Sequence, residues 1–161
     1  MQFDLLVTKY RKQTPQGVLL ALDPGETTGF AVFTNGCLTS TGQLETCSVV
    51  SGVRLLLGLL DTLENPTLVY EDYKVYSWKA EQHSWASLHT PQLIGAIQTL
   101  CYLRQIPAWS QMAQQPKAFC TDSKLKQWGY YKPGQRHARD AIRHGCYYLL
   151  FNAGKSKINS S

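Results

Sequence analysis

Residues 18–33, VLLALDPGETTGFAVF, decide the fold. The stretch contains two apolar runs, at 18–22 and 29–33, and each has the length of one buried strand. A polar turn separates the runs, and the first run ends on a carboxylate, Asp23. A charge at the end of a core strand is costly unless it has a partner or a task, so Asp23 is the first candidate functional residue.

The sequence that follows this stretch predicts a small mixed sheet. Asn35-Gly36 favours a two-residue hairpin turn, because both positions accept a positive φ. Residues 37–44 then alternate loosely and complete a three-stranded antiparallel meander. Two later apolar runs, at 67–71 and 106–113, predict a fourth and a fifth strand.

Helical periodicity separates and follows these later strands. Apolar residues recur every three or four positions over about 47–63 and over 93–103. Residues 117–128 favour a short helix, and 137–151 favour a longer one. The order β-β-β-α-β-α-β-α predicts an α/β domain, in which helices flank a five-stranded mixed sheet whose fourth and fifth strands are parallel.

The bulk composition fits a single domain. Of the 161 residues, 43% are hydrophobic and 17% are charged, which is typical of one globular unit. We expect one domain over 1–161, with 1–16 as an N-terminal extension and 152–161 as a polar tail. The apolar runs are too short to span a membrane and the N-terminus lacks a secretory pattern, so we expect a cytoplasmic protein without membrane contact.

Positive charge is concentrated in the last third of the chain. The net charge is +5, and residues 117–157 contain nine Lys or Arg against only Asp122 and Asp140. This asymmetry favours a polyanionic partner such as nucleic acid. A basic protein without such a partner is an equal alternative on charge alone.

Three carboxylates lie at the ends of separate elements of this predicted fold. Asp23 ends the first strand, Glu71 ends the fourth, and Asp140 lies near the start of the last helix. If the first and fourth strands are parallel neighbours, their carboxylates emerge at the same edge of the sheet, where α/β folds place their sites. His137 precedes Asp140 by three residues and shares its helix face. Taken singly, each acid is as easily a turn or cap residue.

Carboxylates gathered at close range need a cation to offset their repulsion. Carboxylate oxygens suit Mg²⁺ or Mn²⁺, and Mn²⁺ tolerates a histidine nitrogen better than Mg²⁺ does. Two such ions, about 3.5–4 Å apart, can activate a water and stabilise the leaving oxygen of a phosphodiester. The four side chains therefore predict a catalytic metal site whose ligands are held by rigid strands.

Three segments carry a resemblance to a known family. They are LALDPGETTGFAVF (20–33), LVYEDYKVY (68–76) and HARDAIRHGCYYL (137–149). In them the chain resembles the RuvC family of Holliday junction resolvases, within the ribonuclease H-like superfamily, and above all the compact RuvC-like proteins of phages. The resemblance covers about residues 18–151 in the family's order.

The resemblance implies a role for each of the four candidate residues. Asp23 matches the first metal-bridging aspartate, Glu71 the second acidic ligand and Asp140 the last carboxylate. His137 stands where family members have aspartate or histidine. The family implies a ribonuclease H-like fold, a homodimer, two Mg²⁺ ions in each active site, and paired nicks across a four-way DNA junction. It also implies the cytoplasm of a bacterium or of a phage-infected cell.

Basic and aromatic side chains form the candidate DNA-binding set. Aromatic rings interleaved with lysines can stack on unpaired bases, and lysines or arginines can contact phosphates. A core or interface role for the aromatic rings, and a solvated role for each basic residue, are equal alternatives. The candidates are Tyr73, Lys74, Tyr76, Lys79, Lys117, Lys124, Arg139 and Arg143.

Five further residues receive structural predictions. His144 is expected to be buried and hydrogen-bonded, or to support a metal ligand, rather than to be a ligand itself. Asp72 is expected to serve a loop or cap, and Asp122 to cap the short helix that follows it. Gly25 and Gly29 are expected to permit a tight turn and a close backbone approach to metal or phosphate.

The sequence therefore predicts a metal-dependent, structure-selective DNA endonuclease that resolves Holliday junctions by paired phosphodiester hydrolysis. One alternative is a nuclease of the same fold that acts on other branched DNA or on RNA–DNA hybrids. A second alternative is a junction-binding protein without catalysis. The acidic set argues against this last alternative, because a pure binder gains nothing from negative charge beside phosphates.

Overall fold

The computed structural model describes residues 2–13, 15–73 and 88–155. Its elements, in chain order, are α1 (Phe3–Arg11), β1 (Val18–Asp23), β2 (Thr27–Thr34), β3 (Cys37–Glu45), α2 (Val49–Leu60), β4 (Thr67–Glu71), α3 (His89–Leu103), β5 (Ala108–Gln111), α4 (Gln114–Phe119), α5 (Asp122–Gln127), α6 (Arg136–Tyr147) and the π-helical segment η3 (Tyr148–Asn152).

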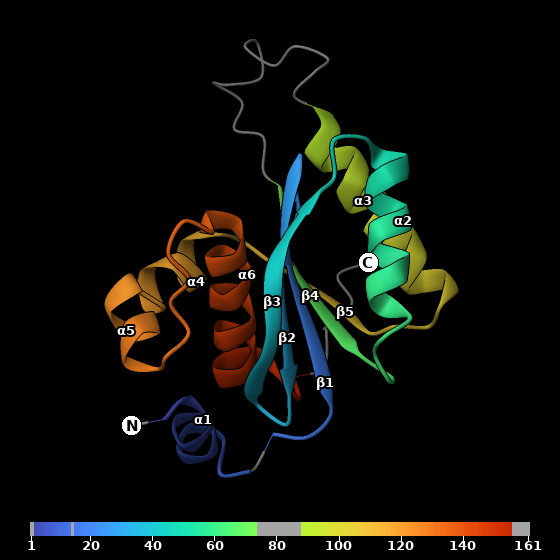
Figure 1. Ribbon diagram of the computed structural model, residues 1–161. Helices are drawn as coiled ribbons and strands as arrows, with labels where there is room; N and C mark the ends of the chain where they lie inside the picture. Colours follow the sequence, from blue (N-terminus) through green and yellow to red (C-terminus); the bar gives the residue numbers. More distant parts are fainter. Residues whose placement is uncertain (1, 14, 74–87, 156–161) are drawn as a thin grey trace.

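The strands form one mixed sheet in the order β3-β2-β1-β4-β5 (Figure 1). β2 pairs antiparallel with both β1 and β3, whereas β4 pairs parallel with both β1 and β5. The predicted α/β class, the meander and the parallel fourth and fifth strands are confirmed. The carboxyl ends of β1, β4 and β5 therefore lie at one edge of the sheet, and their last residues are Asp23, Glu71 and Gln111.

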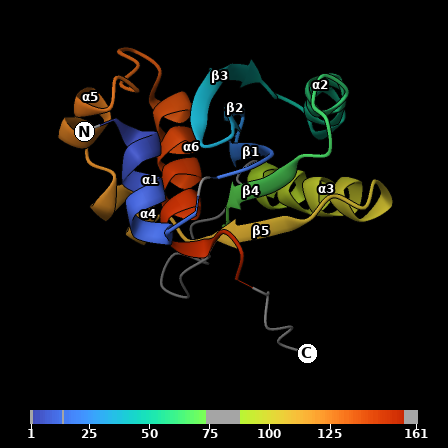
Figure 2. The same cartoon turned by 90° about the horizontal axis from the view of Figure 1, so that it is seen from below.

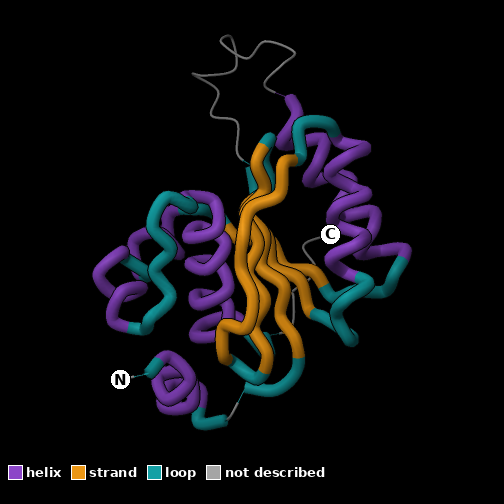
Figure 3. Tube along the Cα trace, viewed as in Figure 1, coloured by secondary structure: helices purple, strands orange, loops and turns teal. Residues whose placement is uncertain are grey.

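Helices cover both faces of the sheet, as Figures 1 and 2 show from two directions. We call the side that carries α2 and α3 the α2/α3 face, and the side that carries α4, α5 and α6 the α6 face. Figure 3 shows the same three layers with the strands in the middle. The core on the α2/α3 face is made mostly of aliphatic side chains from β1, β4, α2 and α3: Leu20, Leu22, Leu56, Leu60, Leu68, Leu93 and Ile97.

Strand alternation decides which face each site residue joins. Leu22 and Tyr70 belong to the core of the α2/α3 face, whereas Ala21 and Val69 belong to the core of the α6 face. Asp23 and Glu71, one residue further along each strand, therefore return to the side of α6. This alternation places both carboxylates beside the one helix that carries the other predicted site residues.

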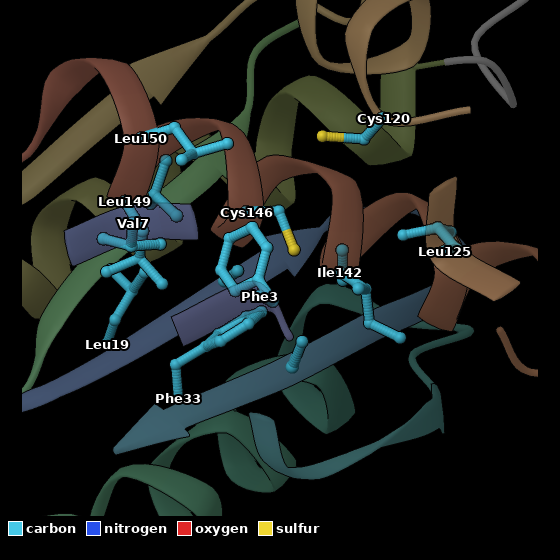
Figure 4. Close-up of a cluster of buried hydrophobic side chains, with 14 residues drawn as sticks. Phe3, Val7, Leu19, Phe33, Cys120, Leu125, Ile142, Cys146, Leu149 and Leu150 are labelled. Carbon is cyan, nitrogen blue, oxygen red and sulfur yellow. The ribbon is translucent and has the colours of Figure 1, made fainter. Parts of the chain in front are cut away.

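Residues 1–16, for which the sequence predicted an extension and no element, include the helix α1. Phe3 and Val7 are buried on one side of this helix and join the core of the α6 face (Figure 4). The Phe3 ring packs against Trp128 and Tyr130, with ring centroids 4.9 and 5.6 Å apart. A short helix with two buried side chains leaves a periodicity too weak to recognise in the sequence.

The short helix predicted over 117–128 is divided into α4 and α5. Thr121 separates them, because its side chain accepts a hydrogen bond from the backbone N–H of Lys124 and begins a new helix there. Asp122, predicted to be this cap, is instead the first residue of α5. Across the described residues, no helix has both the length and the apolar character required to cross a membrane.

Candidate active site

Asp23 begins a turn that buried hydroxyl groups hold in place. The Thr28 and Thr46 hydroxyl oxygens lie 2.8 Å apart, and Thr46 donates to the carbonyl of Gly25 at 2.5 Å. Both threonines are fully buried. These bonds join the turn after β1 to the end of β3, so the backbone that follows Asp23 is held by a second strand.

Two glycines let α6 approach the sheet closely. A Cβ at Gly29 would lie 1.9 Å from the carbonyl oxygen of His137, and a Cβ at Gly145 would lie 2.2 Å from the Phe33 ring. The sequence predicts a close backbone approach to metal or phosphate at Gly29, whereas the approach in the structure is to the start of α6. Gln43 on β3 adds a further link, because its Oε1 accepts from the backbone N–H of His137 at 3.1 Å.

Each of the three predicted carboxylates is paired with a side chain of α6. These pairs place the three acids and His137 at one end of the sheet, as the sequence predicts. The heavy-atom contacts are Asp23 Oδ2 to His137 Nδ1 at 2.8 Å, Glu71 Oε2 to His144 Nε2 at 2.9 Å, and Asp140 Oδ1 to Arg143 Nη1 at 2.5 Å.

Lys117, predicted as a phosphate contact, lies between two of these carboxylates. Its Nζ is 3.3 Å from Glu71 Oε2 and 3.3 Å from Asp140 Oδ2. Partial burial acts to lower the pKa of Lys117, but the charges of Glu71 and Asp140 outweigh it and the pKa is raised. A positive charge thus already occupies the place where two predicted metal ligands converge.

The carboxylates differ in how well their charge is compensated. Burial raises the pKa of Asp23 to about 6; the charges of Glu71 and Asp140 add to this rise, and the hydrogen bond to His137 opposes it. Burial also acts to raise the pKa of Glu71, but its bonds to His144 and Lys117 outweigh burial and the pKa is lowered. Asp23 is therefore the acid that would gain most from an added cation.

The donor set fits a hard divalent cation. It offers carboxylate oxygens from β1, β4 and α6, with the imidazole of His137 beside them. Among the described residues, no group of three or more His, Cys, Asp or Glu side chains is arranged to hold an ion without movement. At least one oxygen of each carboxylate instead contacts His137, His144, Arg143 or Lys117.

Three of the remaining residues predicted to contact DNA are basic side chains whose charged groups contact other parts of the protein. Lys124 donates to the carbonyl of Phe119 at 2.8 Å and lies over the Phe119 ring at 3.6 Å. Arg139 donates to the carbonyl of Lys132 at 2.7 Å. Arg143 is the third, and its side chain is only 14% exposed.

Arg143 joins α6 to the segment between α4 and α5. Its Nε donates to the carbonyl of Cys120 at 2.9 Å, and its two terminal nitrogens pair with Asp140 and Asp122. The Asp122 side chain, predicted to cap a helix, is thus an ion-pair partner. The guanidinium holds Asp140 in place and offsets part of its charge.

The aromatic segment after β4 is described only at its start. Tyr73 packs at the margin of the core on the α2/α3 face. Lys74, Tyr76 and Lys79 lie outside the described residues. Asp72 holds a loop, as predicted, because its Oδ1 accepts from the backbone N–H of Tyr73 at 2.9 Å.

Sequence reasoning missed Gln111 and the supporting role of Gln43. Gln111 ends β5, its side chain is buried, and its Oε1 lies 3.0 Å from His144 Nδ1. Its position at the end of a parallel strand could have indicated a role at the site. A neutral amide, however, indicates a metal site less strongly than a carboxylate does. His144 is fully buried and hydrogen-bonded at both ring nitrogens, which confirms the prediction that it is a buried, hydrogen-bonded histidine.

No family model and no curated protein sequence matches the chain. Among solved structures, the chain is similar to T. thermophilus RuvC in complex with a Holliday junction substrate, with a TM-score of 0.65 and 15% identity over 83% of this chain and 94% of that one. It is also similar to the yeast mitochondrial Holliday junction resolvase Ydc2, with a TM-score of 0.55 and 12% identity over 91% of this chain and 84% of that one.

These similarities, together with the sheet order, define the fold class. The chain has the ribonuclease H-like fold of RuvC, as the sequence predicts. At such low identity the likeness establishes the fold, and the activity rests on the site.

Proposed function

We propose that this chain is a metal-dependent endonuclease that cleaves branched DNA, with the four-way Holliday junction as its substrate. The observation that carries the proposal is the convergence of Asp23, Glu71 and Asp140 at the carboxyl edge of the sheet, beside His137. The shared fold supports it, because the RuvC structure holds a Holliday junction substrate and Ydc2 is a Holliday junction resolvase.

Asp23, Glu71, Asp140 and His137 would hold two Mg²⁺ ions, or Mn²⁺ in their place. When bound, such ions supply an activated water and stabilise the leaving oxygen of the phosphodiester. Burial raises the pKa of Asp23 and the charges of Glu71 and Asp140 add to the rise, which supports a need for further positive charge at this place. A divalent cation therefore has a clear electrostatic advantage at this place.

The protein's own groups position the ligands and balance charge. His137 holds one oxygen of Asp23, and Arg143 holds one oxygen of Asp140. Lys117 is 37% exposed at its side chain, so its ammonium can pair with the carboxylates in the free protein and turn toward a phosphate in the complex. This exchange would add a phosphate contact at the point of cleavage.

Substrate binding would involve the aromatic and basic segment that follows Glu71 in the sequence. Tyr73, Lys74, Tyr76 and Lys79 remain candidates for contacts with the junction, through stacking on unpaired bases and pairing with phosphates. A four-way junction presents two equivalent strands to cut, so a homodimer with two sites matches its symmetry. The site of action would be the cytoplasm of a bacterial or phage-infected cell.

The proposal is tested with an end-labelled synthetic four-way junction and a duplex of the same sequence. Each is incubated with wild-type protein in Mg²⁺, in Mn²⁺ and in EDTA, and with Asp23→Asn as the matched control. We expect paired nicks on the junction alone, dependent on metal and absent with Asp23→Asn.

Other outcomes would redirect or overturn the proposal. Preferential cutting of flaps, forks or RNA–DNA hybrids in parallel reactions would keep the nuclease and change its substrate. Equal cutting of junction and duplex would remove the selectivity for branched DNA. Tight junction binding without cutting in either metal would indicate a binding protein and overturn the catalytic proposal.

A further inference from the structure

A buried chain of polar side chains runs behind Glu71. Gln111 at the end of β5 contacts His144 of α6, with Oε1 3.0 Å from Nδ1. His144 in turn contacts Glu71, with Nε2 2.9 Å from Oε2. Glu71 and Gln111 are also register partners at the ends of the parallel strands β4 and β5. Each of the three residues is thus linked to the other two, through two strands and one helix.

The direction of the hydrogen bond to Glu71 follows from its chemistry. An ionised carboxylate can only accept, so Nε2–H of His144 donates to Glu71 Oε2. The amide of Gln111 can present either its oxygen or its nitrogen to Nδ1. Both orientations of the amide leave Nε2–H directed at Glu71, so Gln111 fixes the plane of the imidazole ring in either case.

This arrangement is unfavourable if it serves stability alone. His144 is fully buried and Gln111 is 6% exposed, and the amide atom of Gln111 that points away from His144 has no hydrogen-bond partner among the described residues. A buried polar atom without a partner costs about 1–3 kcal/mol. Neighbouring positions on α6, such as Ile142 and Cys146, use apolar side chains to fill the same layer. A buried polar chain that ends on a candidate ligand therefore points to a role at the site.

We propose that His144 is a positioning residue, which orients the Glu71 carboxylate toward Asp23 and Asp140, and that Gln111 orients His144. The inference rests on the proposed function, since the orientation of Glu71 matters to a reaction only if Glu71 is a metal ligand. Glu71 meets both His144 and Lys117 through the same oxygen, Oε2. His144 would keep that oxygen in place when Lys117 moves away.

The test uses calorimetric titration of the full-length protein with Mn²⁺ alone. We compare wild type, His144→Leu, which removes the donor, and His144→Gln, whose amide N–H can still donate to Glu71. Ile142→Val is the matched control, because it trims a fully buried side chain of the same helix. Thermal unfolding of each variant in EDTA confirms that it is folded at the temperature of the titration.

We expect His144→Leu to bind Mn²⁺ about 10–100-fold more weakly than wild type, the range usual for lost hydrogen bonds to metal ligands. His144→Gln should recover most of this loss, and Ile142→Val should match wild type. Gln111→Leu should weaken binding in the same direction by a smaller factor, and it provides a second variant if His144→Leu does not fold. With junction DNA, the positioning role lowers kcat and leaves KM unchanged.

Two failures are distinguishable in this experiment. If wild-type protein binds no Mn²⁺, the proposed metal site is overturned, and the positioning role is overturned with it. If wild type binds Mn²⁺ and loses it with Asp23→Asn, while His144→Leu and Gln111→Leu bind as wild type does, the positioning role alone is overturned. Equal loss in His144→Leu and His144→Gln would also contradict it, because the retained donor would then be irrelevant.

Discussion

The two faces of the sheet are built on different principles. The α2/α3 face is packed mainly with leucine and isoleucine, and one polar contact, from Gln98 Nε2 of α3 to the Tyr70 hydroxyl at 2.8 Å, lies among them. The α6 face has an apolar core of its own, but next to it lie four buried polar groups, Asp23, Gln111, Asp140 and His144. Since burying polar groups costs free energy, the comparison indicates that the α6 face gives up stability to hold a site, whereas the α2/α3 face provides stability.

The largest difference between the faces should appear when one residue of each is changed. Asp23→Asn should reduce junction cleavage by more than about 100-fold, beyond the usual effect of a residue that only supports a metal ligand. Leu56→Ala on the α2/α3 face should lower the free energy of unfolding by about 3 kcal/mol and leave the single-turnover cleavage rate of the folded protein unchanged.

Denaturant unfolding and cleavage assays on both variants, below the unfolding transition of each, measure these effects. A large loss of cleavage rate in folded Leu56→Ala would show that the two faces are not separable. Retained cleavage in Asp23→Asn would remove Asp23 from the site.

The second prediction concerns the contact that brings α6 to the sheet. Gly29→Ala would place a methyl group 1.9 Å from the His137 carbonyl oxygen, so α6 must move away from β2. We expect a loss of at least about 1–3 kcal/mol in unfolding free energy from overpacking, together with lost cleavage. Gly58→Ala is the control, because a Cβ there meets no atom within 4 Å. Near-wild-type cleavage by Gly29→Ala would show that the site tolerates movement of α6.

The third prediction concerns α1, which adds to the core of the α6 face without touching the carboxylates. Phe3 is 2% exposed, and Phe3→Ala should lower the free energy of unfolding by about 3–5 kcal/mol. The cleavage rate of the folded variant should stay at the wild-type level. Urea unfolding followed by tryptophan fluorescence measures the first quantity, since Trp128 contacts Phe3. A loss below 1 kcal/mol, on the order of a surface substitution, would show that α1 is not docked in solution.

The last prediction concerns a pH dependence of the metal-free protein. The pKa of Asp23 is raised from 3.8 to about 6 on folding, so between these values the native state holds a proton that the unfolded state has released. Stability therefore falls as pH rises through this window, by at most about 3 kcal/mol from this group. Asp23→Asn cannot ionise and should escape this loss.

Unfolding free energies in EDTA at pH 4 and pH 7 measure this dependence. The variant should match wild type near pH 4 and exceed it at pH 7. Equal pH profiles would show that the charge of Asp23 is compensated in the native protein.

The sequence was sufficient for the parts of this molecule that depend on local patterns. The meander, the parallel strands and the positions of Asp23 and Glu71 follow from strand periodicity and from strand ends. The three-residue spacing of His137 and Asp140 placed both on one helix face. These features need no knowledge of tertiary contacts.

The features that sequence analysis did not reach depend on packing between distant segments. Lys117 lies between Glu71 and Asp140 only because α4 packs against α6, and no local pattern separates it from a solvated lysine. The pairing of Asp122 with Arg143 joins residues 21 positions apart, so the residue types alone suggested a helix cap. The sequence predicted a close backbone approach at Gly29 but assigned it to metal or phosphate, because its actual partner, the backbone at His137, is distant in the sequence.

The central claim is that α6 and the carboxyl edge of the sheet form one metal site. Anomalous X-ray diffraction from crystals soaked in Mn²⁺ tests it most directly. We expect anomalous density between Asp23, Glu71 and Asp140, with Lys117 displaced from its place between the last two, and no such density in Asp23→Asn. Absence of manganese from this position, at a concentration of Mn²⁺ that supports cleavage in solution, would show that these carboxylates do not form the metal site.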